Sequence, residues 1–139
     1  MAKLYFSNDI PRKDDVNIFF ASIPPVHSKR MLLEELSNNL KFPDYFGFNW
    51  DALYDLLCEL YGIEEKTIVV FHESVKNLPV FDLSHYLEII QATCDWWSKC
   101  GDHSVFFVFN YNEKEKIYEL LPKSCEFQFL QFPKGQKCM

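Results

Sequence analysis

The feature that most constrains the fold is a set of three short apolar runs, which lie far apart in the sequence and are separated by helix-like segments. They occupy residues 16–22, 66–71 and 104–109 and read VNIFFAS, KTIVVF and SVFFVF. Runs of this length, without alternation of polar and apolar residues, are typical of strands covered on both faces. Strands that alternate with helices form a parallel sheet with right-handed crossovers. The sequence therefore predicts an α/β domain with three layers, α/β/α, around a small parallel sheet.

Three amphipathic segments, residues 28–40, 49–61 and 82–99, are predicted as the helices that accompany these strands. Ser28 and Asn49 are suitable N-caps, because their side-chain oxygens accept a hydrogen bond from the first helical turn. Apolar residues three and four positions apart give each helix an inward face. In chain order, these inward residues are Leu32, Leu33, Leu36, Leu40, then Leu53, Leu56, Leu57, Leu60, then Leu83, Leu87, Ile90, Cys94 and Trp97.

We expect the whole chain to form one domain, 1–139, with its core at residues 16–109. An extended lead-in precedes this core and includes a possible short strand at residues 4–6. The C-terminal extension, residues 110–139, is predicted to hold a short helix at 113–121, a half-exposed strand at 125–132 and a loose tail. This last strand would add a fourth member at an edge of the sheet.

The most informative stretch is PDYFGFNWDALYDLLCE, residues 43–59, which contains the start of the second helix. One face of that helix carries Asp51, Asp55 and Glu59, each four residues after the one before. Like charges at this spacing destabilise a helix by ~0.2–0.5 kcal/mol per pair. Only Asp51, in the first turn, gains from the helix dipole. The aromatic residues that border this face are Trp50, Tyr54 and Tyr61. The face is either an ordinary solvated surface or a rigid cluster of anions for a cationic partner.

The segment PDYFGFNWDALYDLL also resembles the signature of the barstar family, which consists of small intracellular inhibitors of secreted ribonucleases. The family pattern is Pro, an acidic residue, two aromatics, Gly, a variable residue, Asn, an apolar residue, Asp-Ala-Leu, an aromatic and Asp. The resemblance covers fifteen contiguous positions, about a ninth of the chain. It implies a barstar-like fold and an inhibitor that binds through this segment.

The resemblance also implies roles for single residues. Asp51 and Asp55 match the acidic positions of the family's signature helix, and Tyr45 matches its aromatic contact in the preceding loop. The family's further acidic contact on the next long helix is not clearly reproduced, because Trp96 falls near its place, with Asp95 adjacent. The predicted toxin-binding residues are Tyr45, Phe46, Phe48, Asn49, Trp50, Asp51, Tyr54, Asp55 and Glu59.

The net charge of −6 argues against nucleic acid or an anionic membrane as the direct partner, and it suits a protein that meets a basic partner. Together with the resemblance, it predicts an immunity protein that binds a cognate basic nuclease toxin domain, above all a ribonuclease. We expect a monomer that forms a 1:1 heterodimer. Asp51 and Asp55 would imitate two backbone phosphates in the cleft that holds RNA. The sequence has no signal-peptide pattern, no membrane-spanning apolar run and no CxxC pair among its five cysteines, so we expect a cytoplasmic location.

Two alternatives stay open. The first is a small hydrolytic enzyme, because His72 and Glu73 directly follow a predicted strand, where sites of α/β proteins often lie, and form an acid–base pair. The sequence shows no nucleophile motif, no glycine-rich phosphate loop and no metal-ligand pattern, so we expect no enzyme activity, no cofactor and no metal. The second alternative is a barstar-like interaction module whose partner is not a nuclease.

Overall fold

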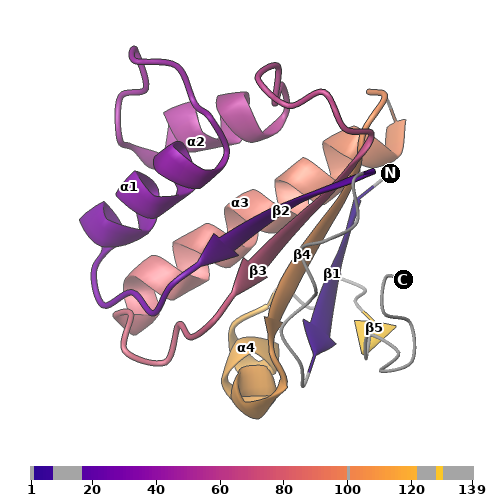
Figure 1. Ribbon diagram of the computed structural model, residues 1–139. Coiled ribbons are helices and arrows are strands. Elements are labelled where there is room, and N and C mark those ends of the chain that lie inside the picture. Colours follow the sequence, from indigo (N-terminus) through magenta and orange to yellow (C-terminus); the bar gives the residue numbers. More distant parts are fainter. Residues whose placement is uncertain (1, 8–16, 100, 122–127, 130–139) are drawn as a thin grey trace.

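The computed structural model describes residues 2–7, 17–99, 101–121 and 128–129, and its strands form one parallel sheet (Figure 1). The spatial order is β2-β3-β4-β1-β5, and every neighbouring pair is parallel. The strands are β1 Ala2–Ser7, β2 Ile18–Ile23, β3 Thr67–His72, β4 Ser104–Asn110 and β5 Gln128–Phe129. The predicted α/β class and parallel sheet are confirmed, and the three apolar runs are β2, β3 and β4.

The helices begin close to their predicted starts, but one ends early. They are α1 Lys29–Asn39, α2 Trp50–Leu57, α3 Val80–Lys99 and α4 Lys114–Leu120, with the short 3-10 helix η1, Tyr111–Glu113, before α4. Ser28 caps α1 as predicted, since its hydroxyl oxygen accepts the Met31 N–H at 3.1 Å. The predicted second helix extended to Tyr61, whereas α2 ends at Leu57. Leu60 has a φ of 50°, a left-handed conformation that a right-handed helix cannot include.

The helices of the described residues all pack on one face of the sheet. Their buried side chains, among them Leu33, Leu57 and Leu87, share one core with strand residues such as Val70 and Phe107. The opposite face carries a separate cluster of strand residues alone, whose buried members are Tyr5, Val69, Phe71 and Val108. The sheet advances in one direction from β2 through β3 to β4, so right-handed crossovers leave their helices on the same side. The described residues therefore form two layers instead of the predicted three.

Two strands of the sheet lie outside the predicted core of residues 16–109. β1 lies between β4 and β5, with Leu4 opposite Phe107, where we had expected only a possible short strand in the lead-in. β5 pairs with β1, which confirms an extra C-terminal strand at a sheet edge. The rest of the strand predicted at 125–132, and the predicted loose tail, lie outside the described residues.

The helix of the C-terminal extension is fastened to the loop that follows β3. The buried Glu113 carboxylate accepts hydrogen bonds from the Ser74 hydroxyl at 2.7 Å and from the Val75 N–H at 2.9 Å. Ile117 of α4 is fully buried in the main core. The extension thus packs as part of the domain up to the end of α4. Cys58 is buried and Cys94 is half-buried, and both are thiols.

Candidate functional site

Helix α2 presents its two carboxylates to solvent. Asn49 fixes the start of the helix, because its side-chain oxygen accepts the Ala52 N–H at 2.8 Å. The apolar residues Leu53, Leu56 and Leu57 are then turned into the core. Asp51 and Asp55 lie one helical turn apart on the opposite side, and both are exposed. We call this exposed pair the front of α2; it forms part of the acidic helix face that the sequence predicted.

The third carboxylate of the predicted stripe is not part of the helix. Glu59 follows the end of α2, and its backbone N–H donates to the Leu56 carbonyl at 3.1 Å in a tighter turn. Its side chain is half-buried and lies in a shallow groove beside Tyr45 and Tyr61. The prediction of three carboxylates on one helix face was therefore wrong for Glu59, because the chain leaves the helix at Leu57.

The neighbouring aromatics Tyr45 and Phe46, in the loop before α2, have opposite environments. Tyr45 is 76% exposed, whereas Phe46 is only 5% exposed and packs against Phe42 and Phe48, at ring-centroid distances of 5.1 and 4.7 Å. Phe48 is half-buried, and the Arg30 guanidinium lies 4.7 Å from its ring centroid. Tyr45 is thus available to a partner, while Phe46 anchors the loop in the core and offers no contact area.

Trp50 joins the front to the body of the protein. Its half-buried indole stacks on the ring of Tyr86 of α3, with 6.4 Å between the ring centroids, and the centroid of the His85 ring lies 6.0 Å away. The Lys29 ammonium group of α1 lies 5.2 Å from the indole ring. Trp50 therefore packs between α1 and α3 and leaves part of its surface beside Asp51.

A further carboxylate, that of Asp95, lies near Tyr54 of α2. Burial raises the pKa of its hydroxyl, and its hydrogen bond with Cys58 and the charges of Asp55 and Asp95 raise that pKa further. Asp95 is an exposed residue of α3, so its charge lies close to the front on α2. Our sequence reasoning left Asp95 out of the site, although the inward apolar residues of the same helix predict that it lies on the outer side of α3.

Left-handed backbone conformations surround α2. Among the described residues, the non-glycine residues with positive φ are Lys41 at 59°, Phe48 at 53° and Leu60 at 50°. Each costs about 1–2 kcal/mol relative to right-handed backbone. Such strain persists where the surrounding structure holds it, and it gathers at binding sites. The loops on both sides of α2 are therefore built to fixed shapes.

At the alternative site, His72 and Glu73, the histidine side chain is buried and cannot contact a substrate. His72 is 1% exposed, its Nδ1–H donates to the Val108 carbonyl at 2.9 Å, and its Nε2 accepts from the Tyr86 hydroxyl at 2.6 Å. Its ring stacks on Phe109 at 4.1 Å. Burial lowers the pKa of His72 to about 4, against a smaller opposite effect of its hydrogen bond to Val108. His72 is thus a neutral core residue with both ring nitrogens occupied.

Neither a metal centre nor a membrane helix is found in the part of the chain that the structure describes. No three His, Cys, Asp or Glu side chains there are grouped to hold a metal ion. No helix there is long and apolar enough to cross a membrane.

A protein-family model described as Barstar (barnase inhibitor) matches residues 16–111, which is more than half of the chain. The matched region contains α1, α2, α3 and the whole site described above, while β1, α4 and β5 lie outside it. No curated protein matches the chain.

Proposed function

The chain belongs to the barstar family, and from this premise we propose that it blocks the active site of a basic nuclease toxin with the exposed front of α2. Members of this family are inhibitors rather than enzymes, and the family implies a role as a ribonuclease inhibitor or immunity protein. The proposal adds the site and the manner of binding. It also includes a 1:1 complex with a ribonuclease toxin, formed in the cytoplasm of the cell that needs protection.

The observation that carries this proposal is the exposure of Asp51 and Asp55 on a capped, well-packed helix. A ribonuclease cleft binds RNA phosphates with cationic side chains, so two carboxylates on a rigid helix can occupy the same cations. Tyr45, in the loop before α2, and the charge of Asp95, on α3, extend this surface. Because the helix is held in place before binding, little conformational entropy is lost when the complex forms.

Electrostatic attraction supports the same proposal. The chain has a net charge of −6, and long-range attraction speeds the association of oppositely charged proteins, up to ~10⁸–10⁹ M⁻¹s⁻¹ at low salt. Such association weakens as ionic strength rises, because salt screens charges beyond about 10 Å at 0.1 M. We therefore expect the association rate with the nuclease to fall steeply with added salt.

The experiment that tests this proposal measures RNA cleavage and binding with the nuclease domain encoded beside this gene, and with barnase as a second probe. Asp55→Ala should weaken binding by ~2 kcal/mol or more, as expected of a binding hot spot. This corresponds to about 30-fold in Kd. Glu119→Ala is the matched control, since Glu119 is an exposed carboxylate on α4, away from α2.

Three results would contradict parts of the proposal. A change below about 0.5 kcal/mol for Asp55→Ala, with the fold intact, is the size of an ordinary surface effect and would remove α2 as the site. Binding that leaves RNA cleavage unchanged would exclude an active-site block. Failure to bind either nuclease would reject a nuclease as the partner and favour the alternative of an interaction module with another ligand.

A further inference from the structure

A second surface lies next to the front of α2, where the loop before the helix meets the loop after it. The structure forms a groove of about 280 Å³ there. Its lining residues are Leu40, Lys41, Phe42, Pro43, Tyr45, Leu56, Glu59, Leu60, Tyr61 and Gly62. Tyr45 comes from the loop before α2 and Tyr61 from the loop after it, so the groove joins two segments that flank the helix.

The groove combines an apolar floor with exposed aromatic walls. Leu56 and Leu60 are buried and form part of the floor. Tyr45 and Tyr61 are 76% and 84% exposed, which makes Tyr61 the most exposed of the large apolar residues described. Exposed tyrosines provide contact area with little loss of side-chain entropy, because the ring has few rotatable bonds. A surface of this kind favours a ligand that is apolar along its stem and polar at its tip.

The shape of the groove depends on unusual backbone. Lys41 and Leu60 line it, and both have left-handed φ angles. Gly62 approaches the backbone of Lys41 so closely that a Cβ added to it would lie 3.1 Å from the Lys41 carbonyl oxygen. Larger residues at position 62 would therefore push the two loops apart and widen the groove.

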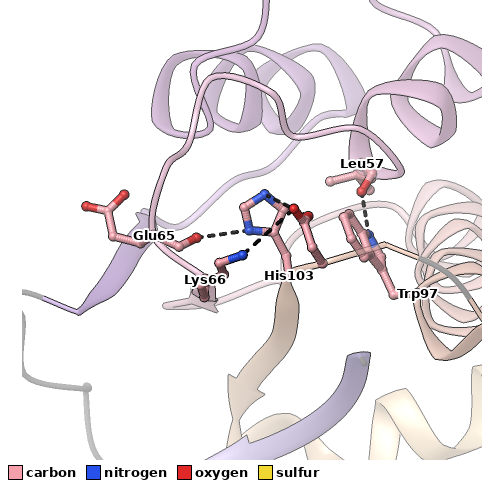
Figure 2. A network of polar contacts seen from close by, with 6 residues as sticks. Leu57, Glu65, Lys66, Trp97 and His103 are labelled. Atoms are coloured by element: carbon pink, nitrogen blue, oxygen red, sulfur yellow. Dashed lines mark hydrogen bonds and ion pairs between the residues drawn. The ribbon is translucent and has the colours of Figure 1, made fainter.

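Hydrogen bonds hold both ends of the loop that carries Tyr61 (Figure 2). The Trp97 indole N–H donates to the Leu57 carbonyl at 2.8 Å, at the start of the loop. At its end, His103 Nδ1–H donates to the Glu65 carbonyl at 2.9 Å. Lys66 and Asp102 face each other nearby at 4.0 Å. Tyr61 and Glu59 are thus displayed on a loop that is fastened to α3 and to the start of β4.

The charges around the groove favour a cation. Glu59 lies in the groove, and Glu59 and Tyr61 also border a second groove of about 410 Å³ that contains the exposed Glu64. Among the described residues, neither glutamate forms an ion pair. The lysine in the groove, Lys41, has its ammonium group 5.2 Å from the Phe19 ring, so it is engaged with β2. Lys66, which also borders the second groove, faces Asp102 at 4.0 Å. Among the described residues, the two glutamates therefore lie beside exposed tyrosine rings without an ion pair of their own.

We propose that the groove between Tyr45 and Tyr61 binds an arginine side chain of the protein partner, with Glu59 as its counter-ion. The inference rests on the proposed function, because it takes the partner to be a basic protein. It adds a contact outside the cationic cleft that α2 would fill. The planar guanidinium stacks on tyrosine rings and donates hydrogen bonds to a carboxylate, while its aliphatic stem lies on Leu56 and Leu60. Lysine fits less well, since its compact ammonium is more strongly hydrated and does not stack.

A titration with a tetra-arginine peptide, followed by the amide chemical shifts of the protein, tests this inference without any nuclease. The Asp51→Ala/Asp55→Ala variant is used as the background, so that the front of α2 cannot bind the peptide. We expect shifts centred on residues 45 and 59–62, and affinity for tetra-lysine that is at least about threefold lower. Adding Tyr61→Ala should weaken tetra-arginine binding by about threefold to tenfold. Tyr118→Ala, which removes another exposed tyrosine on α4, is the matched control and should change nothing.

Equal affinity with and without Tyr61, or shifts spread evenly over the acidic surface, would overturn the inference. The same variants in the nuclease-binding measurement separate it from the proposed function. If Asp55→Ala weakens the complex and Tyr61→Ala does not, the groove has no role in recognition while the inhibitor function stands. If neither variant weakens binding, the proposed function fails, and the peptide titration still decides whether the groove binds arginine.

Discussion

Two clusters in this protein combine aromatic rings with polar groups, and they are built in opposite ways. The sealed column consists of His72, Tyr86 and Phe109, all 1% exposed or less, and its histidine has a hydrogen-bond partner at each ring nitrogen. The second cluster consists of the exposed front, Asp51 and Asp55, and the exposed Tyr45 in the loop before α2. Buried, satisfied polar groups stabilise one fold, whereas exposed like charges weaken it slightly. The difference indicates that the column serves the fold and the front serves binding.

Trp50 connects the two clusters. It is the first residue of α2, next to Asp51, and its ring stacks on Tyr86 of the sealed column. This ring stack is the contact through which a change in the column would reach the front. The predictions below separate the two roles, and they are ordered by the size of the expected effect.

The largest effect is expected for Phe109→Ala in the sealed column. Phe109 is fully buried, and removal of a buried aromatic ring costs ~3–5 kcal/mol of unfolding free energy. Urea denaturation measures this loss. Nuclease binding per folded molecule should stay within about twofold, since the ring is far from solvent. Strong loss of binding by a fully folded Phe109→Ala protein would show that the column also shapes the front.

Acid should destabilise the protein through His72. Its pKa is about 4 in the folded protein and 6.5 in the unfolded chain, so the unfolded state binds more protons between these values. The stability contributed by the neutral ring is complete above pH 6.5 and is lost as the pH falls through about 4. The loss is on the order of 3 kcal/mol. It is measured as unfolding free energy against pH, with His72→Asn as the control. An equally steep pH dependence in the His72→Asn protein would assign the effect to carboxylates instead.

Removal of the N-cap of α2 tests whether the start of this helix serves stability, binding or both. Asn49→Ala should cost ~1 kcal/mol of unfolding free energy, because one N–H of the first turn loses its acceptor. Ser28→Ala at the start of α1 is the matched control and should cost a similar amount. We expect only Asn49→Ala to weaken nuclease binding, since only Asn49 fixes the helix that carries Asp51. Thermal unfolding measures the loss of stability, and nuclease affinity is measured on the same two variants. Equal affinity of the two variants would contradict a role of the Asn49 cap in binding.

The smallest expected effect is a gain in stability, and it separates a binding role from a structural role most clearly. Asp55→Asn removes the repulsion between Asp51 and Asp55 and should stabilise the protein by ~0.2–0.5 kcal/mol. The same change should weaken nuclease binding strongly. Chemical denaturation at low salt resolves the gain, which should shrink at high salt because the repulsion is screened. A loss of stability would mean that Asp55 has a structural role.

Much of the fold was predictable, because periodicity reports which side of an element is buried. The runs that became β2, β3 and β4 were recognisable from their apolar composition, and the caps Ser28 and Asn49 from their chemistry. Two features depended on tertiary structure. The position of β1 between β4 and β5 requires pairing with a strand about a hundred residues away, and no local pattern encodes it. The one-sided helices follow from the order of the strands in the sheet, which the sequence alone did not supply.

The site was predictable where helix geometry decides and unpredictable where loops decide. The exposure of Asp51 and Asp55 follows from their spacing against Leu53 and Leu56. Glu59 was misplaced because the left-handed residue at position 60 ends the helix, and leucine gives no signal for such a conformation. Phe46 was included because adjacent aromatics look alike in a sequence, and only packing decides which of them is buried.

The place of β1 has a consequence for how the chain folds. Residues 2–7 leave the ribosome well before β4, residues 104–110, with which they pair in the sheet. This pairing closes a very long loop, and such contacts of high sequence separation form slowly. Until β4 is synthesised, the backbone groups of β1 cannot pair with it, and the apolar side chains of Leu4, Tyr5 and Phe6 stay outside the core. We therefore expect docking of β1 to be a late step in folding, completed after β2, β3 and β4 have joined.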